Sequence, residues 1–379
     1  MDQVRLLLWG TYDLSKPRNR IVRAGLRANG VDVVEIHAPV WQGVEDKSRI
    51  SGRRAQFGYL ARWIASYPGL IRRYLRAPKH DAVVVGYLGQ LDVIVLWPFA
   101  RLRGVPIIFD VLMSLYNAVV EDRALFGPRH PAARLLYAWE WLSARAADAV
   151  VVNTEEAAKY WVERFGVDRA RMCPILTGAE TDAFPPRPLF RPDDGPVRVL
   201  FYGTFIPLHG VETVFRAAQE CAHEEIDWLI IGEGQESDKA RALLAAHPLP
   251  RLTWLPWVAY EELAGHIHRA DVCLGIFGET RRAGWTIPNK LFQILATGTP
   301  VITRDSPGVR DLLKPDEAGV YLIPPGDPGA LADAVRRFRR DRPGLAGQAL
   351  HRDAVRAFEP AAVGRQIATL ARRLVAERA

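Results

Sequence analysis

Short apolar runs alternate with longer amphipathic stretches throughout the first half of the chain. The stretch that follows the first run has helical character and is closed by Gly30. The runs themselves are rich in β-branched residues: VRLLLWG, VDVVEIHAP, DAVVVGY, VPIIFD and DAVVVN. Strands that are apolar along their whole length and separated by helices indicate a parallel sheet covered on both faces.

A proline-rich stretch, FPPRPLFRPDDGP, interrupts this alternation at residues 184–196. Five prolines among 13 residues cannot continue a helix or a central strand. The alternation then restarts with VRVLFYG and continues to GVYLIPP. We predict an N-terminal α/β domain over residues 1–183, a linker over 184–196 and a second α/β domain over 197–357. The last helix, about 358–379, is expected to cross back to the first domain. Two doubly wound, Rossmann-like domains bind ligands at the carboxyl ends of their strands, here in a central cleft.

The composition fits a globular protein of two domains, with 49% hydrophobic and 25% charged residues among 379. These values exclude disordered and collagen-like chains. Three cysteines without a C-x-x-C pair exclude a disulfide scaffold and favour a reducing cytoplasm. The N-terminus lacks the layout of a signal peptide, because its apolar run is a short strand.

The longest apolar stretch, residues 82–100, contains Gly86, Gly89, Gln90 and Asp92. A membrane-spanning helix needs about 20 apolar residues with few or no charges. A buried strand, a turn and a helix therefore fit this stretch better than a membrane span.

The net charge of +7 is concentrated in one segment. Residues 47–80 contain nine basic side chains and no acidic one, which suggests an anionic partner. From Arg53 to Leu75, apolar residues recur at helical spacing, and Pro68-Gly69 is expected to break the run into two helices. A basic amphipathic helix with aromatic residues is typical of contact with a membrane surface. The alternative is a helix that packs on the sheet with solvated arginines. The candidate contact residues are Arg53, Arg54, Arg62, Trp63, Arg72 and Arg73.

Two glycine-containing loops follow strands of the second half. Gly203 and Gly210 flank a loop before a helix, where close backbone approach and helix amides favour an anion, although any such loop needs a glycine. The second loop, Gly232-Glu233-Gly234, lacks the third glycine of a dinucleotide fingerprint, and no strand-end acid follows about 20 residues on. This absence argues against a nicotinamide dehydrogenase.

Positive charges gather around a third strand-to-helix connection. Pro288 is suited to the first position of a helix, Arg281 and Arg282 precede it, and Lys290 lies in its first turn. Cations are unfavourable at a helix N-terminus, since the helix dipole favours anions there. Their placement is explained if a phosphate binds among them. A solvated charge cluster is the alternative.

Residues 197–340 resemble the retaining nucleotide-sugar glycosyltransferases of family 4, which have the GT-B fold. The matching pieces are the loop at 203–210, IIGEG, LTWLPWV, DVCLGIF, IPNKLFQILATGTPVITRDSPGVRDLL and GVYLIPPGDPGALADAV. In the first half, ILTGAETDAF resembles the segment of the family that leads into the linker. The resemblance implies a donor-binding second domain and an acceptor-side first domain.

The resemblance also implies roles for particular residues. The donor-binding set is Gly10, Gly203, Thr204, His209, Gly210, Glu233, Val258, Arg282, Asn289 and Gln293. The catalytic set is Asp110, Arg281 and Lys290, with Asp110 ending a strand and orienting the acceptor, or else capping the next helix. Thr204 and His209 stand where many members have Arg and Lys, and Trp285 and Gln293 stand where many have two glutamates.

The implied chemistry is front-face transfer with retention, in which cations and helix amides stabilise the departing diphosphate. No Asp-x-Asp occurs, the family usually needs no metal, and no cofactor is expected. His266 and His268 are a poor metal pair without a nearby cysteine. The expected acceptor is a polysaccharide, glycolipid or lipid-linked sugar at the cytoplasmic membrane face. The alternatives are a non-catalytic nucleotide-sugar-binding or membrane-associated protein, and a hydrolase or epimerase of the same fold. Nucleic acid is not an expected partner, because no recognised motif accompanies the basic segment.

Overall fold

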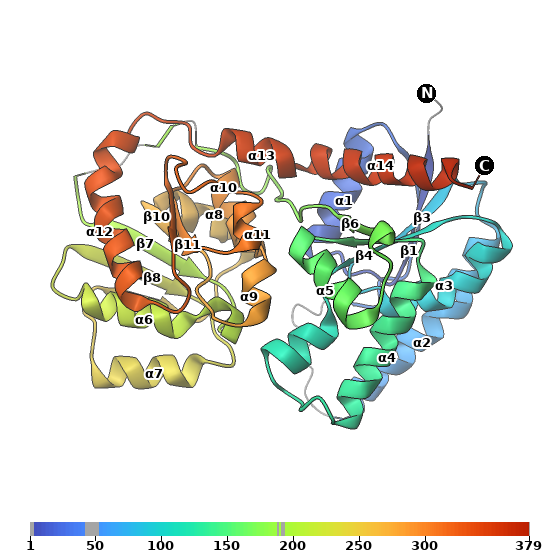
Figure 1. Ribbon diagram of the computed structural model, residues 1–379, viewed down its shortest axis with the longest axis horizontal. Coiled ribbons are helices and arrows are strands. Elements are labelled where there is room, and N and C mark those ends of the chain that lie inside the picture. Colours follow the sequence, from blue (N-terminus) through green and yellow to red (C-terminus); the bar gives the residue numbers. More distant parts are fainter. Residues whose placement is uncertain (1–3, 42–52, 188, 191–193, 379) are drawn as a thin grey trace. The chain divides into compact units, whose positions relative to one another are not determined.

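The computed structural model describes residues 4–41, 53–187, 189–190 and 194–378, with the side chains of 53–57 left out. It divides into two compact units (Figure 1). Unit 1 runs to Val120, continues over Phe126–Gly178 and resumes at Glu359. Unit 2 holds Glu121–Leu125 and Ala179–Phe358.

Unit 1 is built on a parallel sheet of six strands in the described part of the chain, in the order β2-β1-β3-β4-β5-β6. The strands are β1 (Arg5–Gly10), β2 (Asp32–His37), β3 (Ala82–Val85), β4 (Ile107–Leu112), β5 (Ala149–Val152) and β6 (Met172–Pro174). The helices are α1 (Pro17–Ala28), α2 (Arg53–Leu75), α3 (Gln90–Leu102), α4 (Pro131–Ala146), α5 (Glu155–Phe165) and α14 (Pro360–Ala376). Short helical turns lie at η3 (Arg169–Arg171) and at η2 (Asn117–Asp122), whose last two residues belong to unit 2. The predicted doubly wound architecture is confirmed for this unit, because its apolar runs form buried parallel strands.

The last helix, α14, packs against α1 of the same unit. Two glycines permit the close approach, since a Cβ on Gly364 would lie 2.0 Å from the carbonyl carbon of Gly25. The Asn29 side chain donates a hydrogen bond to the Ala361 carbonyl at 2.7 Å. The end of the chain therefore contributes to the core of unit 1, through residues such as Val363 and Ile367.

Unit 2 is built on a second parallel sheet, with β12-β11-β10-β7-β8-β9 as the order of the described strands. The strands are β7 (Val197–Tyr202), β8 (Ile226–Ile231), β9 (Leu252–Leu255), β10 (Val272–Leu274), β11 (Val301–Arg304) and β12 (Val320–Ile323). The helices are η4 (Pro207–His209), α6 (Val211–Glu220), α7 (Ser237–Ala246), α8 (Tyr260–Arg269), α9 (Arg281–Trp285), α10 (Asn289–Ala296), α11 (Pro307–Arg310), α12 (Pro328–Leu345) and α13 (Arg352–Phe358).

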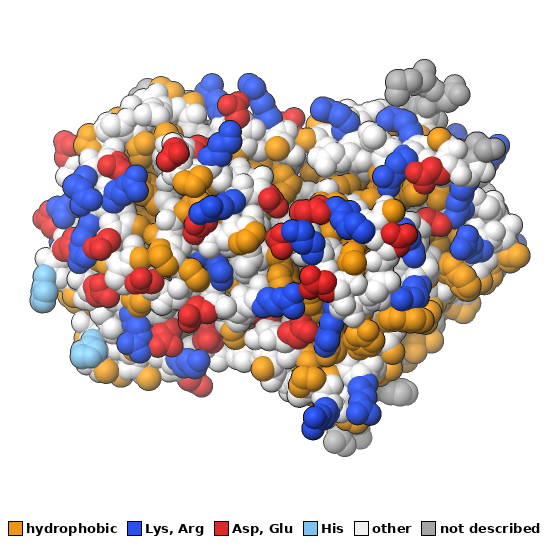
Figure 2. Space-filling view, in the orientation of Figure 1, with side chains coloured by type: hydrophobic (Ala, Val, Ile, Leu, Met, Phe, Trp, Pro, Cys, Tyr) orange, Lys and Arg blue, Asp and Glu red, His pale blue; other side chains and the backbone are white. Residues whose placement is uncertain are grey.

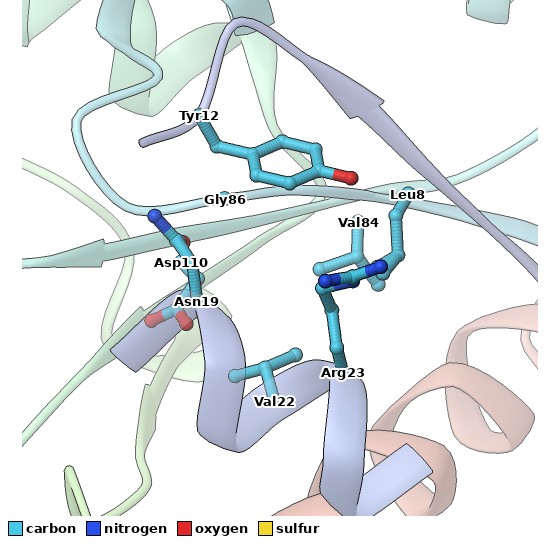
Figure 3. A pocket seen from close by; sticks show the side chains of 8 residues that line it. All are labelled: Leu8, Tyr12, Asn19, Val22, Arg23, Val84, Gly86 and Asp110. Atoms are coloured by element: carbon cyan, nitrogen blue, oxygen red, sulfur yellow. The ribbon is translucent and has the colours of Figure 1, made fainter. Parts of the chain in front are cut away.

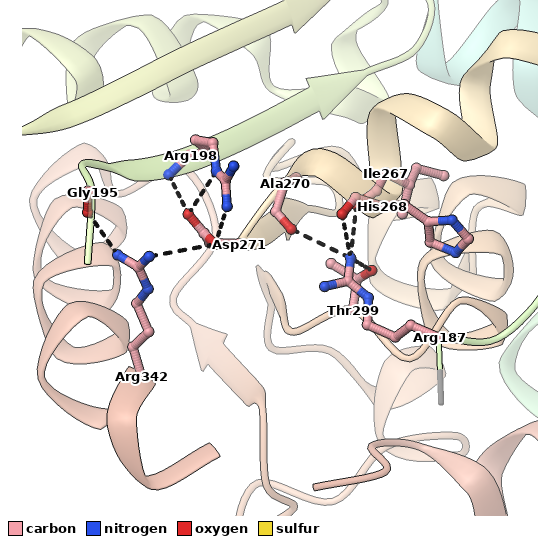
Figure 4. Close-up of polar contacts among 9 residues, drawn as sticks. All are labelled: Arg187, Gly195, Arg198, Ile267, His268, Ala270, Asp271, Thr299 and Arg342. Carbon is pink, nitrogen blue, oxygen red and sulfur yellow. Dashed lines mark hydrogen bonds and ion pairs between the residues drawn. The ribbon is translucent and has the colours of Figure 1, made fainter. Parts of the chain in front are cut away.

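The proline-rich stretch that we expected to be a linker is bound to unit 2 (Figure 4). One amino group of Arg187 donates to the carbonyls of Ile267 and His268 at the end of α8, at 3.1 and 3.2 Å. Phe190 is buried in the core of the unit, and Arg342 of α12 donates to the Gly195 carbonyl at 3.0 Å. The prolines end the preceding element, while these contacts fix the path of the chain.

Two local predictions have different outcomes. The apolar stretch at 82–100 forms β3, a turn and most of α3, as predicted. The expected break at Pro68 is wrong, because α2 continues through this proline to Leu75. Pro68 and Ile64 are exposed, so water can reach the carbonyl group that loses its helical partner.

In the described part of the chain, every helix is too short or too polar to span a lipid bilayer.

Candidate functional site

The carboxyl ends of β7 and β8 meet at two glycines. Gly203 has φ +144° and Gly232 has φ +138°, and a Cβ on Gly232 would lie 2.0 Å from the Gly203 carbonyl oxygen. Gly210 has φ +60°, and a Cβ there would lie 2.5 Å from the Gly278 amide nitrogen. The loop between Gly203 and Gly210 is therefore held close to the backbone of its neighbours, which only glycine allows.

Lys290 lies in the first turn of α10, beneath this loop, and is 4% exposed. Its ammonium donates to the Gly275 carbonyl at 2.9 Å and lies 3.8 Å from the centroid of the Phe201 ring. Among the described residues Lys290 makes no ion pair. Burial lowers the pKa of Lys290 well below its ordinary value. A buried cation without a counter-charge is costly, so this position favours an anionic ligand.

His209 lies against the same glycine. Its Cε1 would be 2.8 Å from a Cβ on Gly203, and its Nδ1 is buried without a hydrogen-bond partner in the described part of the chain. Burial, and secondly the nearby Lys290, lower the pKa of His209 well below its ordinary value. The imidazole is therefore neutral near pH 7, and its unpartnered nitrogen can take one further hydrogen bond.

Gln293 and Arg282 both have partners inside unit 2. Gln293 is 7% exposed, and its Oε1 accepts from the Tyr202 hydroxyl at 3.1 Å. Arg282 is 8% exposed and pairs with buried Asp122 at 3.1 Å, while Thr280 donates to the same carboxylate at 2.7 Å. The prediction that Arg282 meets a phosphate charge is corrected, because Asp122 already neutralises it.

The other predicted donor residues lie at the same edge of the sheet. Arg281 is exposed, with its guanidinium 5.4 Å from the Trp285 ring centroid. Glu233 accepts a hydrogen bond from Arg241 at 3.1 Å. Thr204 and Asn289 are exposed, and Val258 is half-buried just beyond β9.

Sequence reasoning missed two exposed residues near this edge. Trp257 follows β9 and is 61% exposed. Glu279 is exposed and lines a surface hollow together with Gly210 and Phe277. Both stand directly after strand-forming runs, in LTWLPW and DVCLGIFGE, so their position after a strand is the signal that could have identified them.

In unit 1, the loop after β1 is fixed by one buried carboxylate. Thr11 donates to Asp92 from its amide at 2.7 Å and from its hydroxyl at 2.9 Å. Tyr67 of α2 donates to Asp92 at 2.7 Å, and a Cβ on Gly10, which has φ +127°, would lie 2.2 Å from this carboxylate. Gly10 therefore serves the packing of its own loop against Asp92.

Trp63, predicted as a surface contact, is half-buried and belongs to this network. Its indole nitrogen donates to the Thr11 hydroxyl at 2.8 Å. Its ring contacts those of Trp41 and Trp139, at centroid distances of 5.5 and 6.2 Å. The polar end of Trp63 therefore faces the loop after β1.

Asp110 has a different environment from the one predicted. β4 continues to Leu112, so Asp110 lies within the strand rather than at its end. Its two oxygens accept from Arg18 at 2.7 and 3.2 Å, and both side chains are 1% exposed. Arg18 also donates to the Leu176 carbonyl at 2.7 Å. We therefore correct the assignment of Asp110 from the acceptor to the support of the fold.

A small cavity beside this ion pair is shown in Figure 3. Tyr12 and Asn19 lie over it from the loop after β1 and from α1. The lining residues are Leu8, Tyr12, Asn19, Val22, Arg23, Val84, Gly86 and Asp110. The Tyr12 hydroxyl donates to Glu35 at 3.2 Å, so the walls of the cavity are themselves hydrogen-bonded.

Within the described residues, no group of three His, Cys, Asp or Glu side chains is arranged to hold a metal ion. Nδ1 of His266 accepts a hydrogen bond from Arg269 at 3.1 Å, whereas Nε2 of His268 donates to the Pro185 carbonyl at 2.9 Å. The two histidines thus have separate partners.

Solved structures define the class of protein. The chain is similar over 99% of its length to sucrose-phosphate synthase from Thermosynechococcus elongatus, covering 100% of that chain, with a TM-score of 0.69 and 20% identity. It is similar over 98% of its length to HepE of Anabaena in complex with UDP-glucose, covering 100% of that chain, with a TM-score of 0.67 and 13% identity. These likenesses define a GT-B fold, as predicted.

The family follows from the sequence itself. Residues 3–178 match the family described as glycosyl transferase 4-like domain, and residues 196–341 match the glycosyl transferases of group 1. A D-inositol 3-phosphate glycosyltransferase of Nocardioides sp. is 27% identical over 351 residues, 82% of this chain and 69% of that relative. The chain belongs to the family 4-type glycosyltransferases, and the resemblance seen in the sequence is confirmed.

Proposed function

We propose that this glycosyltransferase moves a sugar, with retention, from a nucleoside-diphosphate donor to a polysaccharide, glycolipid or lipid-linked acceptor at the cytoplasmic membrane face. The observation that carries the proposal is Lys290, a buried ammonium that makes no ion pair among the described residues and lies beneath Gly203. A diphosphate would supply the missing negative charge. The similarity to HepE in complex with UDP-glucose supports this class of donor.

The transfer reaction requires stabilisation of the leaving diphosphate. When the bond between the sugar and the diphosphate breaks, negative charge grows on the diphosphate. Helix α10 has no side-chain cap, and the amides of a first helical turn are directed toward the N-terminal end of the helix. Lys290 lies in the same turn. Charges held in advance at that position stabilise the transition state more than the ground state, which raises the rate. Lys290 and these amides are the groups that we assign to this role.

A membrane location would bring the enzyme to a lipid-linked acceptor. Arg62, Arg72 and Arg73 of α2 are exposed, and Arg73 also donates to the His37 carbonyl at 3.0 Å. The predicted contacts of Arg53 and Arg54 lie outside the described side chains. The positive charge of α2 supports attraction to an anionic lipid surface.

We expect Trp257 to carry the nucleobase of the donor. In the sheet β9 is the second strand from β7, so the two strands are about 10 Å apart at the usual strand spacing. This separation matches the distance from the diphosphate of a nucleotide to its base. Trp257→Ala should raise the KM for the donor by about tenfold with little change in kcat, since base–aromatic stacking contributes about 1–3 kcal/mol. Steady-state kinetics measure this split, with Trp257→Phe as the control that restores stacking. A fall in kcat at constant KM would contradict the role.

The test of the function is donor turnover. Purified protein is incubated with a panel of nucleotide sugars, with and without membrane extract, and the released nucleoside diphosphate is measured. Release that requires extract supports transfer, whereas release without extract supports a hydrolase. Protection against thermal unfolding without release supports the binding-only alternative. Glu279→Gln in the same panel tests whether this carboxylate contacts the sugar, because loss of such a contact would raise the KM for the preferred donor.

A further inference from the structure

Large apolar side chains are exposed together on one side of unit 1. They lie on α2, α3 and α4, and α3 contacts both of the other helices. We call this surface the α2–α4 face, and it consists of Leu60, Ile64, Trp97, Leu102, Leu135, Trp141 and Leu142. Leu102 is 84% exposed and Leu135 is 70% exposed. Figure 2 shows apolar side chains gathered at the lower right, where Figure 1 draws these helices.

These side chains are not part of the core that covers the sheet. On α4, Ala133, Glu140 and Ala144 are buried, whereas Leu135 and Leu142 lie on the opposite side of the helix. On α3, Val93 and Leu96 are buried, whereas Trp97 is 43% exposed. The two helices therefore carry a second apolar face after the first is buried. Exposed apolar side chains gathered on neighbouring helices in this way mark an interaction site.

The exposed charges on the same three helices have one sign. In their described part, the acidic side chains are Asp92 and Glu140, both 0% exposed. Asp92 accepts hydrogen bonds from Thr11 and Tyr67, and Glu140 accepts from the Leu115 amide at 2.6 Å. The exposed charged residues are basic: Arg62, Arg72, Arg73, Arg101 and Arg134. The exposed charges that these three helices carry in their described part are therefore all positive.

We propose that the α2–α4 face inserts its apolar side chains into an anionic membrane surface. This inference deepens the membrane location in the proposed function, because it adds hydrophobic insertion by α3 and α4 to the electrostatic contact of α2. A second copy of the chain is disfavoured as the occupant. In a two-fold dimer the same patch meets itself, so the basic side chains Arg62, Arg101 and Arg134 would face a surface of the same sign, with no exposed carboxylate in the described part of the three helices to balance them.

Hydrophobic insertion and electrostatic attraction respond differently to salt, since only the second is screened. We expect the wild-type protein to float with vesicles of equal parts phosphatidylcholine and phosphatidylglycerol, and part of it to stay bound in high salt. The double variant Leu102→Gln/Leu135→Gln keeps the net charge and should lower the salt-resistant binding by about tenfold or more. Leu189→Gln, at a leucine of unit 2 that is 36% exposed, is the matched control and should bind like the wild type.

The charge contribution is tested separately. Arg62→Gln/Arg134→Gln should weaken binding at low salt and leave the salt-resistant fraction in place. Nucleoside-diphosphate release from the donor panel is measured on every variant, so that loss of membrane binding with intact turnover isolates the surface from the sugar chemistry. A wild type that turns over donor but binds no vesicles would overturn this inference and leave the proposed function standing.

A second measurement covers the case in which the leucine variants do not fold. Lipids brominated in the acyl chain should quench tryptophan fluorescence of the wild type more than that of Trp97→Phe. Equal quenching would show that Trp97 does not enter the acyl region and would contradict the proposal. Binding that salt releases completely, or a wild-type dimer that Leu102→Gln/Leu135→Gln converts to a monomer, would also overturn it.

Discussion

We expect Lys290→Met to lower kcat/KM for the nucleotide-sugar donor by about 10²- to 10³-fold, the usual effect of removing one group that stabilises developing negative charge. The same variant should unfold at the same or a higher temperature than the wild type. Met replaces the buried cation by an apolar chain of similar length, which removes the cost of burying a charge without a counter-charge. Steady-state kinetics and thermal denaturation together check this pair of results. Loss of both activity and stability would instead assign Lys290 to the support of the fold.

Proton uptake provides an independent readout for Lys290. Its pKa in the free protein is lowered by burial, and a bound diphosphate would raise the pKa again toward the ordinary value of 10.5. At a pH between these two pKa values, Lys290 should therefore take up a proton when the diphosphate binds. The affinity for the diphosphate should rise as the pH falls through that interval. Calorimetry in buffers of different ionisation enthalpy measures the uptake, which Lys290→Met should abolish. Lys314→Met, at an exposed lysine, is the control and should leave the uptake unchanged.

We expect Asp110→Ala to lower the free energy of unfolding of unit 1 by about 3–5 kcal/mol, because it leaves Arg18 buried without its partner. Urea denaturation measures this effect. Asp32→Ala is the matched control, since it breaks an ion pair with Arg5 in which both side chains are about 40% exposed, and it should cost about 1 kcal/mol or less.

The double variant Arg18→Met/Asp110→Leu distinguishes structural support from catalysis. The double variant replaces Arg18 as well as Asp110, so no buried charge is left without a partner. Its free energy of unfolding should therefore be close to that of the wild type and well above that of Asp110→Ala. If Asp110→Ala kept its stability and lost turnover, the catalytic role first predicted for Asp110 would be restored.

The order of strands along the chain could be predicted because each strand of a parallel sheet is buried on both faces. AVVV and VRVLFY are apolar over their length for that reason, and they form β3 and β7. Gly203 could be chosen as a candidate because it stands directly after β7, and Lys290 because it stands in the first turn of α10. In both cases the information lies within a few residues of the chain.

The environment of each charge could not be predicted in the same way. Arg282 and Lys290 look alike in the sequence, yet Arg282 is neutralised by Asp122, 160 residues earlier. In the sequence Asp110 stands at the end of an apolar run, where it could contact an acceptor. In the structure its carboxylate is paired with Arg18 of α1, 92 residues earlier. Trp63 flanks the apolar stripe of α2, yet its indole nitrogen donates a hydrogen bond to Thr11, 52 residues earlier.

The sequence by itself determined two α/β sheets, the family of the protein and the loop that holds the candidate donor site. These depend on local periodicity and on short motifs, which one element carries alone. Only the tertiary structure decided which buried charges have partners, which apolar face of α3 and α4 stays uncovered, and that Lys290 is buried without an ion pair in the described part of the chain. These properties arise from neighbours that folding brings together from distant parts of the chain, and no single stretch of sequence contains them.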